Sequence, residues 1–156
     1  ELSADGRFFL VTPADERISM PMLAEGYRKF VMLAWLLLNG ELLERKFLLW
    51  DEPETNMNPK MVSLMQKILL SLAQQGIQIF IATHDYLFAS ELSLENEAEK
   101  PDRPPIKFFS LYKTKKAGVK VETADTMPDL EHNPILDEYA DHYDRETIAM
   151  GGIPVK

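Results

Sequence analysis

The middle of the chain carries two short, mostly apolar runs, separated by a stretch in which apolar residues are spaced differently. The runs are KFLLW at 46–50 and IQIFIA at 77–82, and they predict central parallel strands covered on both faces. After Asn58-Pro59, a strong helix start, apolar residues recur at helical spacing until Gly76. This order predicts a right-handed parallel crossover unit of strand, helix and strand.

Further elements are predicted before this unit. GRFFLVT at 6–12 is rich in strand-forming residues and follows the turn signal Asp5-Gly6. Residues 25–38 are polar for one turn and then apolar all round, which predicts a helix buried on most sides that ends at Asn39-Gly40.

After the second predicted strand the pattern of parallel strands and helices ends. We expect a polar, proline-containing loop at 93–105, and two β-rich segments within 106–124 predict an antiparallel hairpin. The acidic tail from 133 to 150 predicts a helix, whose core-facing residues are expected to be Ile135, Tyr139 and Tyr143. The expected fold class is therefore α/β, with parallel strands and crossover helices in 1–92 and a hairpin and acidic helix in 106–156.

The composition of the chain argues against several classes of function. The formal net charge of −8 argues against a nucleic-acid surface on this segment, and much of the acidity lies in runs that are expected to be solvated. The absence of cysteine excludes thiolate metal sites and fits a reducing, cytoplasmic location. The longest apolar run, FVMLAWLLL, is shorter than the roughly 20 residues that span a bilayer.

The residues that are candidates for catalysis or ligand binding lie at the ends of the predicted elements. Asp51 and Glu52 follow the first apolar strand, His84 follows the second, and Gly26 stands where the first long helix begins. Ligands bind beyond the carboxyl ends of parallel strands, so these residues are expected to serve one ligand. A strand-end acid can hold Mg²⁺, a second acid can activate water, and a helix N-terminus attracts an anion. The pattern therefore favours phosphate hydrolysis.

FLLWDEPETNMNP, LAEGYRK and IFIATHD together resemble motifs of the ATP-binding-cassette (ABC) class of P-loop ATPases. Within it, the chain is most similar to the soluble branch that holds SMC-like, DNA-repair and phage-defence ATPases, over about residues 8–92. The resemblance implies that FLLWDEPE is the Walker B strand, with Asp51 associated with Mg²⁺ and Glu52 the general base. It also implies that His84 is the switch histidine that senses the γ-phosphate.

The same resemblance implies two segments that face a partner head. The D-loop at the dimer interface would comprise Thr55, Asn56, Met57 and Asn58. The signature motif, which meets the partner's ATP, would comprise Leu23, Ala24, Glu25, Gly26 and Arg28. Ala24 stands where the class usually has a serine, and Arg28 and Lys29 are candidates to compensate for the missing hydroxyl.

No phosphate-binding loop of the form G-x-x-x-x-G-K-[ST] occurs in the sequence. The chain also opens without an initiator methionine, so we expect a C-terminal half of a head whose Walker A half lies upstream or on another chain. The segment alone is expected to be inactive, whereas the completed head would bind ATP, hydrolyse it and dimerise, driving a DNA-repair or phage-defence complex with a nuclease or other effector.

Two other readings stay open. A non-catalytic interaction module is favoured by Ala24 and the missing phosphate loop, but it leaves the strand-end acids without a purpose. A metal-dependent hydrolase built on Asp51, Glu52, His84 and Asp85 lacks a second nearby histidine, since His132 and His142 lie in the acidic tail.

Overall fold

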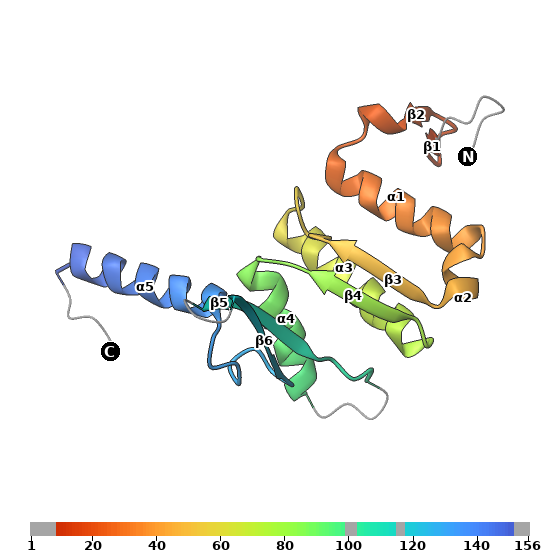
Figure 1. The fold of residues 1–156 in the computed structure, drawn as a ribbon. Helices are drawn as coiled ribbons and strands as arrows, with labels where there is room; N and C mark the ends of the chain where they lie inside the picture. The colour runs from red at the N-terminus through yellow and green to blue at the C-terminus, as the bar shows by residue number, and fades with distance from the viewer. Residues whose placement is uncertain (1–8, 99–102, 115–117, 152–156) are drawn as a thin grey trace. The chain divides into compact units, whose positions relative to one another are not determined.

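The computed structural model describes residues 9–98, 103–114 and 118–151, which form two compact units. The first runs to Thr83 and the second begins at His84 (Figure 1). The elements of the first unit are, in order, β1 (Phe9–Val11), β2 (Arg17–Ser19), the 3₁₀ turn η1 (Met20–Met22), α1 (Glu25–Leu38), α2 (Glu41–Arg45), β3 (Phe47–Asp51), α3 (Pro59–Gln74) and β4 (Gln78–Ala82). The predicted turn at Asp5-Gly6 lies outside the described residues.

The predicted order of strand, helix and parallel strand is confirmed. β3 and β4 pair in parallel, with Phe47 opposite Gln78 and Asp51 opposite Ala82. The Asn58 side chain accepts a hydrogen bond from the Met61 N–H and so caps α3, with proline at the first helical position. This cap satisfies an N–H group that has no partner within the helix.

The two parallel strands are covered on only one face, which corrects the expectation of cover on both. α3 lies along one face of the pair (Figure 1), and its inward residues are buried; they are Val62, Met65, Leu69 and Leu72. On the opposite face Phe47, Leu49 and Phe80 are 50%, 68% and 48% exposed. No described element of the first unit covers them, so this apolar face is open within that unit.

The second unit contains α4 (Tyr86–Glu97), the hairpin strands β5 (Phe108–Thr114) and β6 (Gly118–Ala124), and α5 (Pro134–Ala149). β5 and β6 pair antiparallel, as predicted, and the register places Leu111 opposite Val121. The loop expected to start at residue 93 is helical up to Glu97, because α4 continues through it. Hydrogen bonds from the Met127 N–H to the Ser93 hydroxyl, and from the Asn96 amide to the Asp125 carbonyl, tie α4 to the segment after β6.

The acidic C-terminal helix α5 forms as predicted and is capped by the Asn133 side chain, which accepts from the Leu136 N–H. The expectation that its tyrosines belong to the core is wrong: Tyr139 and Tyr143 are 50% and 57% exposed. Tyr139 instead stacks on Tyr86 of α4, with ring centroids 4.4 Å apart. Among the described residues, no helix is both long and apolar enough to cross a membrane.

Candidate functional site

The predicted Mg²⁺-associated acid, Asp51, is the last residue of β3 and is exposed at the carboxyl end of the strand. Its carboxyl group has no hydrogen-bond or ion-pair partner in the part of the chain that the structure describes. Mg²⁺ takes oxygen ligands and keeps several of its waters. An exposed strand-end carboxylate with no protein partner fits a hydrated ion of this kind.

Glu52, the predicted general base, lies directly beyond the strand in a left-handed backbone conformation with a φ of 47°. A residue other than glycine pays about 1–3 kcal/mol for such a conformation, which persists only where the surroundings hold it. Here the Glu52 N–H donates to the Ala82 carbonyl at 2.8 Å. The ammonium nitrogen of Lys29 donates to the Glu52 carbonyl at 2.6 Å. The backbone of the predicted base is therefore fixed from both sides.

The predicted D-loop forms a tight turn between β3 and α3. The Thr55 hydroxyl donates to the Glu52 carboxylate at 3.0 Å, and Lys29 also donates to the Thr55 carbonyl at 3.1 Å. Asn56 has a φ of 61°, the second left-handed residue of this turn. Asn58 ends the turn as the cap of α3. The turn is consequently a fixed structure within the chain.

Gly26, in the first turn of α1, is buried against this same turn. A Cβ atom built on Gly26 would lie 2.9 Å from the Asn56 carbonyl oxygen and 3.2 Å from Met57 Cγ. Real Cβ atoms essentially never approach a backbone oxygen so closely. The structure thus brings the predicted signature glycine against the predicted D-loop of the same chain, and this contact requires a glycine.

The remaining predicted signature residues form the entry to α1. Leu23 ends the 3₁₀ turn, and Ala24 occupies the N-cap position of α1 without a side-chain hydrogen bond. Glu25 lies in the first turn, where a negative charge is favoured. The Arg28 guanidinium donates to the Leu23 carbonyl at 2.9 Å and to the Pro21 carbonyl at 3.0 Å. Arg28 therefore fixes the shape of this entry segment.

The predicted switch histidine, His84, is exposed and opens the second unit, two residues after the end of β4. The next residue, Asp85, caps α4, because its carboxylate accepts from the Phe88 N–H at 2.7 Å. Asp85 thus has a structural function that the sequence pattern did not reveal.

Two residues of the first unit have partners that the sequence did not predict. Lys29 was expected at most to compensate for Ala24, yet it holds the turn after β3. Glu54 is 6% exposed, and its carboxyl group accepts a hydrogen bond from the Thr83 hydroxyl. A glutamate that directly follows Asp51-Glu52-Pro53 was the available signal, but its partner lies 29 residues further along the chain.

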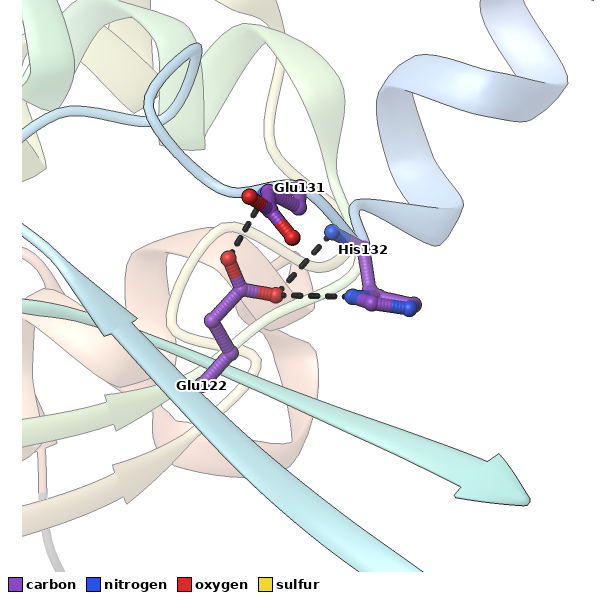
Figure 2. Close-up of side chains that lie close together, drawn as sticks. All are labelled: Glu122, Glu131 and His132. Atoms are coloured by element: carbon purple, nitrogen blue, oxygen red, sulfur yellow. Dashed lines mark hydrogen bonds and ion pairs between the residues drawn. The ribbon is translucent and has the colours of Figure 1, made fainter.

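A second group of acids and a histidine lies in the hairpin unit. Figure 2 shows that the Glu122 carboxylate faces Glu131 and His132. It accepts from the Glu131 N–H at 2.7 Å and the His132 N–H at 3.0 Å, and lies 3.1 Å from His132 Nδ1. The His132 ring stacks on Tyr112, with centroids 4.0 Å apart. These bonds attach the segment before α5 to the hairpin, which accounts for the cluster as a structural feature.

Two known proteins with similar sequences are described as ATP-binding proteins. The chain is 26% identical over 102 residues to the glutamine transport ATP-binding protein GlnQ of Geobacillus stearothermophilus, covering 62% of this chain and 40% of the relative. It is 33% identical over 82 residues to the energy-coupling factor transporter ATP-binding protein EcfA of Methanococcus maripaludis, covering 49% of this chain and 28% of the relative. The chain thus spans less than half of the length of each relative.

A solved structure from work on the "structural biochemistry of ATP-driven dimerization and DNA stimulated activation of SMC ATPases" has a similar fold, with a TM-score of 0.50 at 10% identity. The match covers 82% of this chain and 66% of that chain.

The family model described as "AAA domain, putative AbiEii toxin, Type IV TA system" matches residues 3–90, which is more than half of the chain. This range contains the turn after β3 and the entry to α1, as well as His84. The similarities to ATP-binding proteins and to the SMC ATPase structure support a P-loop ATPase fold of the ABC type, and the chain belongs to this AAA-domain family.

Proposed function

We propose that this chain is the signature, Walker B and switch-histidine half of an ATPase head that hydrolyses ATP and dimerises when ATP binds. The observation that carries the proposal is the conformation of Glu52, which directly follows the exposed Asp51 and is held at a φ of 47°. A strained residue held firmly at a strand end is typical of catalytic sites. A pure interaction module would have no use for such strain.

The proposed chemistry divides between the two acids. Bound Mg²⁺–ATP supplies the phosphoryl group and neutralises charge on its oxygens. Asp51 would hold the ion through water. Glu52 would orient the attacking water and take its proton, and His84 would donate a hydrogen bond to the terminal phosphate. The Thr55 hydroxyl, which donates to the Glu52 carboxylate at 3.0 Å, fixes the direction of the base.

We further propose that a preceding segment or a separate chain supplies the phosphate-binding Walker A half. The open face of β3 and β4 supports this proposal, because Leu49 is 68% exposed and Phe47 50% exposed. Large apolar side chains grouped on one sheet face favour a covering element. The relatives, of whose length this chain spans 40% and 28%, leave room for such a half.

The biological setting is also a proposal. The family description names a putative toxin of a type IV toxin–antitoxin system, and the similar fold comes from work on DNA-stimulated SMC ATPases. Both support a role in phage defence or DNA repair, with a nuclease or other effector as partner. The net charge of −8 supports the proposal that any DNA contact lies outside this segment.

The test is ATP turnover by the complete protein that carries this segment, with Glu52→Gln beside the wild type. The substitution keeps the size of the side chain and removes the base, so we expect the rate to fall at least about a hundredfold while an ATP-bound dimer accumulates. Glu44→Gln changes an exposed acid of α2 and is the matched control, which we expect to retain full turnover. If neither the wild type nor Glu52→Gln hydrolyses ATP or dimerises with it, the interaction-module reading replaces this one.

A further inference from the structure

The buried carboxyl group of Glu54 stands apart from the proposed catalytic acids. It is 6% exposed, whereas Asp51 is exposed and Glu52 half-buried. One carboxyl oxygen accepts a hydrogen bond from the Thr83 hydroxyl. The other is, among the described residues, the one buried side-chain nitrogen or oxygen without a hydrogen-bond partner.

Such a group is unfavourable as a mere packing element. A buried polar oxygen without a partner destabilises the folded state, and an apolar side chain of similar volume is usually neutral or better at such a position. Unsatisfied buried polar groups therefore call for an explanation other than stability. For Glu54 we look for the explanation in the hydrogen bond that its other carboxyl oxygen accepts from the Thr83 hydroxyl.

The hydrogen bond joins the two strand ends of the first unit just beyond their ladder. Glu54 lies three residues after Asp51, and its carbonyl accepts from the Met57 N–H at 3.1 Å, so its backbone belongs to the fixed turn. Thr83 directly follows Ala82, the last residue of β4 and the register partner of Asp51. Thr83 is also the last residue of the first unit, and the next residue is His84.

We propose that Glu54 is a positioning residue for the switch histidine: by holding the Thr83 hydroxyl, it sets where the main chain leaves β4, directly before His84. The inference rests on the proposed function, because it assigns a purpose to His84 in ATP hydrolysis. A displacement of about 1 Å at a catalytic group can cost on the order of a hundredfold in rate. The hydrogen bond from the Thr83 hydroxyl to Glu54, directly before His84, restrains the chain against such a displacement.

The kinetic test uses matched pairs of substitutions in the complete protein. Glu54→Met and Thr83→Val remove the hydrogen bond at nearly constant volume, and we expect each to lower kcat by about 10-fold to 100-fold. KM for ATP should change by less than about twofold, since neither Glu54 nor Thr83 is proposed to contact the nucleotide. Glu54→Gln and Thr83→Ser keep an acceptor and a hydroxyl, respectively, and we expect both to retain kcat within about threefold.

The double variant Glu54→Met/Thr83→Val separates positioning from stability. Replacing both partners of a hydrogen bond by apolar groups is close to neutral for folding. The double variant should therefore unfold in urea at the same concentration as the wild type, while its kcat is as low as that of either single variant. Equal effects of single and double variants would show that the two residues act as one unit.

An NMR readout makes the inference independent of turnover. The ring signal of His84 can be assigned by its loss in His84→Gln, and we expect it to shift in Glu54→Met and Thr83→Val but not in Thr83→Ser. If the wild type lacks ATPase activity while the His84 signal shifts as described, the proposed function fails and the positioning of His84 by Glu54 stands. If the signal and kcat are unchanged in Glu54→Met, or if Glu54→Gln is as impaired as Glu54→Met, the inference is overturned.

Discussion

The ammonium group of Lys29 lies 2.6 Å from the Glu52 carbonyl oxygen and 3.1 Å from that of Thr55. One side chain near the start of α1 therefore holds two carbonyl groups of the tight turn that follows β3. Because Glu52 has a φ of 47°, this contact offsets part of the cost of the left-handed backbone. The predicted signature helix and the predicted base are thus physically connected within one chain.

Removing this contact should affect both stability and turnover. Lys29→Met keeps the aliphatic stem and removes the ammonium group, which leaves two carbonyl oxygens without their charged donor. We expect the free energy of unfolding to fall by about 1.5–3 kcal/mol, measured by urea denaturation. ATP turnover of the complete protein should fall further than stability alone explains, because Glu52 loses its fixed backbone.

The matched control is Lys67→Met, which removes the same charge from an exposed position on α3. We expect this variant to stay within about 0.5 kcal/mol of the wild type. If Lys29→Met and Lys67→Met behave alike, Lys29 is not a determinant of the turn.

For Gly26→Ala, whether the free energy of unfolding rises or falls tests the close approach of Gly26 to the turn after β3. In an open helix position, Gly→Ala stabilises a protein by about 0.5–1 kcal/mol. At Gly26 the added methyl group would lie 2.9 Å from the Asn56 carbonyl oxygen, so we expect Gly26→Ala to destabilise by about 1–3 kcal/mol. Urea denaturation measures the change, and Ala34→Gly at an exposed position of α1 gives the size of the helix-propensity effect. A stabilised Gly26→Ala variant would contradict the close approach seen here.

Local chemistry made several elements predictable. The Asn58-Pro59 cap, the stop at Gly76 and the continuous apolar strands depend on neighbours in sequence, and the structure has all three. The capping function of Asp85 was not predicted, although an aspartate directly before an apolar helix is a common N-cap. Its carboxylate in fact accepts from the Phe88 N–H.

The contacts between residues far apart in the chain could not be predicted from the sequence. Lys29 lies 23 residues from Glu52, and Glu54 lies 29 residues from Thr83. No periodicity or spacing rule relates such positions, because the register of β3 and β4 and the path of α1 bring them together. The open face of the strands was missed because a continuous apolar run predicts burial but does not say which part of the chain provides the cover.

The open face of β3 and β4 can be tested in the complete protein. If a Walker A half covers this face, Leu49→Asp places a carboxylate in a buried interface, and we expect a loss of several kcal/mol in the free energy of unfolding. Leu64→Asp is the control, since Leu64 is similarly exposed, at 51%, but lies on α3. Equal, small effects of the two substitutions in urea denaturation would mean that the strand face remains open to solvent.

The last prediction concerns pH and the bonds between Glu122 and the segment before α5. The hydrogen bond from the Glu131 N–H, together with those from His132, holds the pKa of Glu122 below its ordinary value of 4.5 against the opposing effect of desolvation. A carboxyl group with a lowered pKa in the folded state contributes stability above its unfolded pKa. That contribution is lost as the pH falls through the folded value.

We therefore expect Glu122→Gln to unfold at lower urea concentration than the wild type near about pH 7, with the gap closing as the pH falls toward about 3. Glu138→Gln is the control, because Glu138 forms an exposed ion pair with Arg145 at 2.8 Å, and such pairs contribute little. A gap for Glu122→Gln that stays constant across this range would mean that the charge of Glu122 does not hold the segment. The same gap closing at acid pH would show that ionised Glu122 attaches α5 to the hairpin.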